Sequence, residues 1–151
     1  MIDPRLEADL AGAEGSRLYA YRDSEGNWTI GRGHLLLPQS HDWRGYTITA
    51  AEEETLFDSD ILVATAFAQR LPEWPALDTD CRRNAVIELC FNLGGKWLGF
   101  VLCRAAIERH DWQAAHDQLL NSLWAREVGS ERSNRLADYL LTGEYPVPDQ
   151  P

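Results

Sequence analysis

One long helix constrains the fold of this chain more than any other feature. The run Thr49-Ala50-Ala51-Glu52 is typical of a capping box, and apolar residues recur at helical spacing from there to the stop signals Pro72 and Pro75. This pattern predicts one helix of about twenty residues, which spans about 30 Å at about 1.5 Å per residue. A helix of that length can leave a small lobe and continue into a second one.

The residues before the long helix predict a small β-structure. A short helix ends just after Glu14, and the chain then changes to β-branched and aromatic residues. These residues flank the turn-forming run 23–27, which predicts a hairpin with strands near residues 17–22 and 28–33. Residues 47–48 are the candidate for a third, short strand.

The residues after the long helix predict only further helices, at 78–93, 97–109, 111–126 and 131–141. Gly94 and Gly143 follow the first and the last of these, where a glycine commonly ends a helix. The predicted fold class is therefore α+β, with a small β-hairpin lobe joined by the long helix to a larger all-helical lobe.

A chain of 151 residues is long enough for one compact domain with a sizeable core. We expect a single domain over residues 1–151. Residues 14–60 then form the hairpin lobe and the start of the linking helix, and residues 1–13 and 61–151 form the helical lobe.

Charge and composition exclude several classes of partner. The chain has 24 acidic and 14 basic residues and a net charge of −10, which is unsuited to gripping a phosphate backbone. No window approaches the roughly 18 apolar residues of a membrane helix, and the first residues lack the pattern of a signal peptide. We therefore expect no nucleic-acid partner, no stable membrane insertion and synthesis in the cytoplasm. The three cysteines form no CxxC motif and are expected to be buried free thiols.

Three polar residues stand where the predicted elements meet. Glu14 ends the first helix, Asp23 enters the hairpin turn, and Thr29 lies on the returning strand. Singly, each has a structural interpretation, as a solvated glutamate, an Asx-turn aspartate and a β-forming threonine. Together, their spacing and the run 29–36 (TIGRGHLL) resemble the T-even phage lysozyme family, glycoside hydrolase family 24. The resemblance continues through residues 56–60, 82–94, Trp124 and 132–135, and so covers nearly the whole chain.

This resemblance implies that Glu14, Asp23 and Thr29 form a catalytic set. Hydrolysis of a glycosidic bond needs one carboxylic acid to protonate the leaving oxygen and one carboxylate to activate or position water. We assign Glu14 as general acid, Asp23 as general base or water-positioning carboxylate, and Thr29 as the hydroxyl that holds the water. Inversion is implied by the family alone, and the sequence leaves open whether Asp23 acts as base, nucleophile or electrostatic support.

The resemblance also implies supporting residues. Arg135 is expected to approach the catalytic acid and to bind substrate, although a solvated arginine is the alternative. Phe91 and Asn92 match positions that line the saccharide cleft, and core packing is the alternative for Phe91. His34 is expected to pair with Asp60 and so attach the hairpin to the long helix. The remaining histidines show no ligand spacing, so we expect no metal and no cofactor.

The function implied is that of an endolysin, a muramidase that cleaves the β-1,4 bond between N-acetylmuramic acid and N-acetylglucosamine in peptidoglycan glycan strands. We expect a monomer made in the host bacterial cytoplasm, which reaches the periplasm and cell wall after a holin permeabilises the membrane. The alternatives are a lytic transglycosylase, which needs an acid such as Glu14 but not Asp23 or Thr29, and a non-catalytic cell-wall-binding module.

Overall fold

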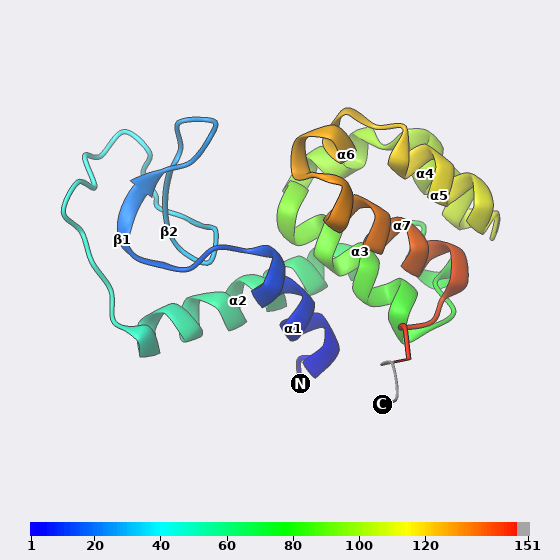
Figure 1. Cartoon of the computed structure of the whole chain (residues 1–151), viewed down its shortest axis with the longest axis horizontal. Helices are drawn as coiled ribbons and strands as arrows, with labels where there is room; N and C mark the ends of the chain where they lie inside the picture. The colour runs from blue at the N-terminus through cyan, green and yellow to red at the C-terminus, as the bar shows by residue number, and fades with distance from the viewer. Residues whose placement is uncertain (148–151) are drawn as a thin grey trace. The chain divides into compact units, whose positions relative to one another are not determined.

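The computed structural model describes residues 1–147 and confirms the α+β class (Figure 1). Within these residues the chain forms seven α-helices and one three-stranded antiparallel sheet. It divides into two compact units, Met1–Val63 and a second that begins at Ala64. The predicted lobes, with residues 14–60 in one and residues 1–13 and 61–151 in the other, stay a prediction.

The first unit begins with helix α1 (Pro4–Ala13). Asp3 caps it by accepting a hydrogen bond from the Arg5 N–H, and Pro4 occupies the first turn, where a missing N–H costs nothing. The strands follow in the order β1 (Arg17–Arg22), β2 (Trp28–Gly31) and β3 (His34–Leu35), and each pairs antiparallel with the next.

The third strand is not the one predicted. Strand β3 immediately follows β2, whereas Thr47 forms only an isolated bridge with Tyr19. The register of β1 against β2 shifts between Arg17 and Tyr21. The other edge of β1 bonds to the segment that contains Thr47 through residues 18 and 20, whose backbone groups pair with residues 48 and 46. This pairing between distant segments leaves no local pattern in the sequence.

Helix α2 (Ala50–Gln69) has the predicted 20 residues and the predicted capping box. The Glu52 N–H donates to Thr49 Oγ1 at 3.1 Å, and the Thr49 N–H donates back to Glu52 Oε1 at 3.4 Å. The boundary between the two units falls within this helix. Ahead of α2, the sheet has its own small core, formed by Trp28, Ile30, Leu36 and Ile48.

The second unit contains helices α3 (Asp80–Leu93), α4 (Val101–Glu108), α5 (Trp112–Leu120), α6 (Leu123–Val128) and α7 (Ser130–Thr142), with short 3-10 helices at Trp74–Ala76 and Gly94–Gly99. Most side chains of α3 are buried, and α3 packs against α7, which also packs against α5 and α6 (Figure 1). The predicted helix 111–126 is two helices, because Ser122 caps α6 by accepting from the Ala125 N–H. The predicted helix 97–109 begins only at Val101, after the glycine-containing 3-10 segment.

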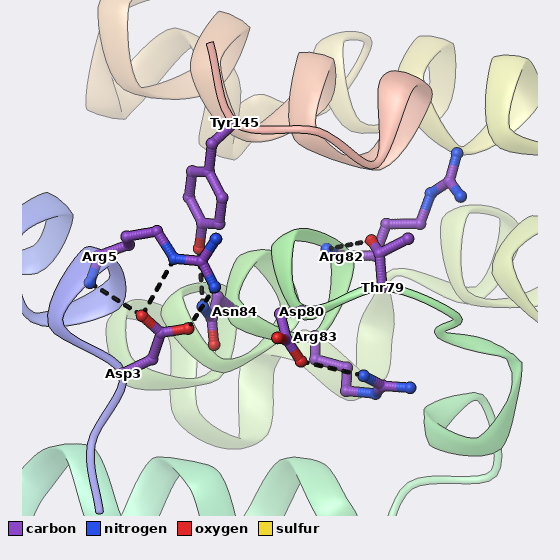
Figure 2. A network of polar contacts seen from close by, with 8 residues as sticks. All are labelled: Asp3, Arg5, Thr79, Asp80, Arg82, Arg83, Asn84 and Tyr145. Atoms are coloured by element: carbon purple, nitrogen blue, oxygen red, sulfur yellow. Dashed lines mark hydrogen bonds and ion pairs between the residues drawn. The ribbon is translucent and has the colours of Figure 1, made fainter. Parts of the chain in front are cut away.

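Polar contacts join α3 to the segment around the end of α7. Figure 2 shows the Thr79 hydroxyl capping α3 at the Arg82 N–H and the Asn84 amide donating to the Tyr145 hydroxyl at 2.7 Å. The Arg82 guanidinium also donates to the carbonyls of Leu140 and Leu141. It thereby satisfies backbone groups that a helix end leaves without intrahelical partners.

Among residues 1–147, no helix taken singly has the length and apolar character needed to cross a membrane. The bent pair Asp80–Gly99 and Val101–Glu108, with an angle of 104° between its members, meets that test by length and composition only.

Candidate active site

Glu14 is the C-cap residue of α1. Its backbone leaves helical geometry (φ −95°, ψ 139°), while its N–H still donates to the Leu10 carbonyl at 2.9 Å. The side chain lies against the turn between β2 and β3, since a Cβ atom at Gly33 would stand 3.2 Å from Glu14 Oε2. Gly33 has φ +80°, which a side chain rarely allows. The carboxyl group therefore occupies space that only a glycine leaves open.

Asp23 lies at the entrance to the β1–β2 turn and is anchored through one oxygen. Its Oδ1 accepts from the N–H groups of Glu25 at 2.9 Å and Asn27 at 2.8 Å, in an Asx-type turn. Among the described residues, no group donates a hydrogen bond to its Oδ2. The turn thus holds the carboxylate in one orientation and leaves its second oxygen available.

Thr29 lies on β2 with a relative exposure of 3%. Its hydroxyl donates to the Asn27 carbonyl at 2.9 Å. Because this contact uses the hydroxyl proton, the lone pairs of Thr29 Oγ1 remain able to accept a hydrogen bond from another donor. In the sheet Thr29 pairs directly with Tyr21 of β1.

The charges of both carboxylates act on the hydroxyl of Tyr21. Burial raises the pKa of its hydroxyl above the usual value, Arg17 lowers it, and the negative charges of Glu14 and Asp23 raise it further. The Arg17 guanidinium lies over the Tyr21 ring at 4.3 Å from the centroid. The charges of both carboxylates therefore act on one hydroxyl group. The residue that carries it, Tyr21, is the cross-strand partner of Thr29. The sequence analysis does not identify Tyr21 as a site residue.

The expected contact of His34 with Asp60 is present, with Nδ1 2.8 Å from Oδ2. A second contact with α2 was not foreseen. Glu53, whose side chain is 6% exposed, accepts a hydrogen bond from Ser16 Oγ at 2.6 Å and pairs with Arg32 Nε at 3.3 Å. A signal existed in the sequence, because Glu53 precedes Phe57 and Ile61 at the spacing of the buried helix face.

The remaining predicted site residues lie in the second unit. Arg135 makes a two-pronged ion pair with Glu88, at 2.9 and 2.8 Å, and Arg132 donates to the same carboxylate at 3.0 Å. Glu88 is 1% exposed and balances part of this positive charge. The expected approach of Arg135 to the catalytic acid stays a prediction.

The two expected cleft residues follow each other near the end of α3. Asn92 is exposed, and its Oδ1 accepts from the Trp124 indole N–H at 2.7 Å. Phe91 is half-buried, which leaves part of its side chain open to solvent. Their expected contact with saccharide stays a prediction. No group of three or more His, Cys, Asp or Glu side chains in residues 1–147 is arranged to hold a metal ion.

Comparison with known proteins identifies the family of this chain. The family model described as phage lysozyme matches residues 11–137, a range that includes Glu14, Asp23 and Thr29. The chain is 30% identical over 154 residues to "Probable T4-type lysozyme 1" and 29% identical to "Probable T4-type lysozyme 2", both of Dictyostelium discoideum. Each alignment covers 86% of this chain and 89% of the relative. The chain is also 29% identical to "Pre-baseplate central spike protein Gp5" of Enterobacteria phage T4, with 86% of this chain and 26% of that protein covered. This chain therefore belongs to the phage lysozyme family and is a glycoside hydrolase of the lysozyme type.

Proposed function

We propose that this lysozyme hydrolyses the β-1,4 bond between N-acetylmuramic acid and N-acetylglucosamine in bacterial peptidoglycan, with Glu14 as general acid. The observation that carries the proposal is geometric: the Glu14 carboxyl lies against the β2–β3 turn, and the Asp23 carboxylate is held at the β1–β2 turn of the same three-stranded sheet. Most glycoside hydrolases use a pair of carboxyl groups that flank the scissile bond.

Asp23 and Thr29 prepare the attacking water. The Thr29 hydroxyl donates its hydrogen bond to the Asn27 carbonyl, so its oxygen accepts a hydrogen bond from the water. Asp23 accepts a second hydrogen bond from the water through Oδ2, while its Oδ1 stays fixed by the turn amides. The water oxygen is then directed away from both acceptors and toward the anomeric carbon.

The bond changes balance without any further reactant. The water oxygen bonds to the anomeric carbon, and its proton passes to Asp23. The glycosidic C–O bond breaks, and the leaving oxygen takes the proton of Glu14. The two carboxyl groups supply acid and base and water is the nucleophile, so this mechanism uses no metal or cofactor. Attack by water on the opposite face inverts the anomeric configuration.

In its biological setting, the protein acts as a monomeric endolysin on glycan strands during host cell lysis. It is made in the host bacterial cytoplasm and meets its substrate in the periplasm and cell wall after a holin has opened the inner membrane. Support for this setting comes from the phage lysozyme family match. Expression in a bacterial host should leave turbidity unchanged until the inner membrane is permeabilised, and lysis without permeabilisation would contradict the dependence on a holin.

The catalytic assignment is tested on purified peptidoglycan with wild type, Glu14→Gln and Asp23→Asn. We expect loss of activity in Glu14→Gln, because the amide has no proton to give to the leaving oxygen, and a strong reduction in Asp23→Asn. Full activity in Glu14→Gln would refute the assignment. Reducing ends in the products identify a hydrolase, whereas 1,6-anhydro ends identify a transglycosylase. Binding of the wild-type protein without any cleavage would identify a wall-binding module.

A further inference from the structure

We propose that Glu53 is a positioning residue for the catalytic acid. Its buried carboxylate joins the link that follows Glu14 to the β2–β3 turn, against which the Glu14 carboxyl lies. The inference rests on the role proposed for Glu14. It concerns contacts inside the first unit only and adds a residue of α2 to a site otherwise formed by residues 14–34.

Glu53 is a buried charge with two partners from the hairpin region. Its Oε2 accepts from the Ser16 hydroxyl at 2.6 Å, and its Oε1 faces Arg32 Nε at 3.3 Å. The Arg32 guanidinium also lies over the ring of Phe57, at 4.7 Å from the centroid, one helical turn beyond Glu53. A buried carboxylate is tolerated only when it is paired in this way, so these contacts hold their positions strongly.

The two partners of Glu53 belong to the two segments that bear on the Glu14 carboxyl. Ser16 is two residues after Glu14, in the link between α1 and β1. Arg32 directly precedes Gly33, the residue against which Glu14 Oε2 rests. One carboxylate therefore sets both the backbone from which the acid projects and the turn against which the acid lies.

The backbone of the turn is shaped to admit this carboxylate. Gly31 has φ +63°, and a Cβ atom there would stand only 3.2 Å from Glu53 Cγ. The glycines at 31 and 33 thus leave room for two glutamates, Glu53 and Glu14. The His34–Asp60 contact also attaches the end of this turn to α2, through side chains that are 29% and 27% exposed. In the Glu53 attachment, Arg32 is exposed to a similar extent, 28%, but the carboxylate itself is only 6% exposed and has Ser16 as a second partner.

The test is the variant Glu53→Gln, which keeps the size of the side chain and removes its charge. The amide oxygen can still accept from Ser16, but Arg32 loses its counter-charge, and the turn under Glu14 is released. We expect kcat to fall about tenfold, with KM changed less than twofold, because a displacement of about 1 Å at a catalytic group can cost about 100-fold in rate. A purely structural role would lower the melting temperature and leave the kcat of the folded enzyme unchanged.

Glu73→Gln is the matched control. Glu73 is 0% exposed, and Arg104 Nε donates to it at 2.8 Å, so it is also a buried glutamate paired with an arginine Nε. Both residues of this pair belong to the second unit. We expect Glu73→Gln to lower the melting temperature at least as much as Glu53→Gln while its kcat, measured well below the transition, stays within twofold of wild type.

Two further variants keep the proposal testable if Glu53→Gln folds poorly. Ser16→Ala removes only the hydroxyl tie and should lower kcat severalfold. The double variant Glu53→Gln/Arg32→Gln replaces the unpaired arginine by a neutral hydrogen-bonding pair and should recover part of the lost kcat. Equal kcat in Glu53→Gln and Glu73→Gln, or a wild-type kcat in Ser16→Ala, would overturn the role of Glu53. Activity of Glu14→Gln would instead refute the proposed function itself, so the two failures are distinguishable.

Discussion

Replacement of Gly33 by alanine tests the geometry around the catalytic acid with a single methyl group. The backbone at Gly33 has φ +80°, where an L-residue is strained by about 1–2 kcal/mol. Loss of glycine's freedom in the unfolded chain returns about 0.4–1 kcal/mol, so the net loss of stability is about 1 kcal/mol. For a chain of this size, such a loss lowers the melting temperature by about 2–4 °C.

The new methyl group also meets the catalytic carboxyl. It would lie 3.2 Å from Glu14 Oε2, so the carboxyl must yield by a few tenths of an ångström. If a displacement of 1 Å costs about 100-fold in rate, a displacement of this size costs about fourfold. The expected result for Gly33→Ala is therefore a small thermal destabilisation together with a fall of about fourfold in kcat.

Gly45→Ala is the control that separates backbone strain from contact with the Glu14 carboxyl. Gly45 has φ +84°, so an alanine there carries the same strain, but its Cβ would have no heavy atom within 4 Å. Thermal unfolding followed by circular dichroism and initial rates of reducing-end release would be measured for both variants. The two should lose similar stability, and only Gly33→Ala should lose activity. Equal activity in the two variants would refute the claim that Glu14 rests against the β2–β3 turn.

The carboxylate of Asp23 raises the pKa of the Tyr21 hydroxyl, so Asp23→Asn should lower that pKa. NMR titration of labelled tyrosine measures the change. An unchanged or higher pKa would contradict the closeness of Asp23 to Tyr21. Glu88→Ala removes the buried carboxylate that Arg132 and Arg135 share, and it should lower the free energy of unfolding in urea by about 3–5 kcal/mol. A loss below about 1 kcal/mol would count against that buried pairing. Burial raises the pKa of the Cys90 and Cys103 thiols to about 12, and Cys81 is also a buried free thiol. A thiol reagent at pH 8 should therefore leave the native protein unmodified and label all three cysteines in denaturant. Rapid labelling of the native protein would contradict their burial.

Features with local causes were predictable from the sequence. Helix α2 begins at its capping box, because the cap and the helix it starts are neighbours in the chain. The candidate catalytic residues were selected by a short spacing pattern, since Glu14, Asp23 and Thr29 lie within sixteen consecutive residues.

Features that depend on distant partners were not predictable. Tyr19 pairs with Thr47 from a distant part of the chain, and Thr47 forms only this isolated bridge where the sequence pattern predicts a third strand. The partners of Glu53 lie up to 37 residues away, so its role emerges only once the helix has packed on the hairpin.

One difference from the prediction does have a local cause. The predicted helix 111–126 is split because Ser122 is a strong N-cap residue within a segment that otherwise has helical spacing.

The closeness of the three candidate residues along the chain has a consequence for folding. The entropy lost on closing a loop grows only with the logarithm of its length, about 0.6 kcal/mol for each doubling. By this relation, the span of 37 residues closed by the Ser16–Glu53 contact costs only about 0.7 kcal/mol more than the span of 16 that holds Glu14, Asp23 and Thr29. The hairpin and its attachment to α2 can therefore form together, so that the reactive groups and the contact that positions Glu14 are assembled in one step.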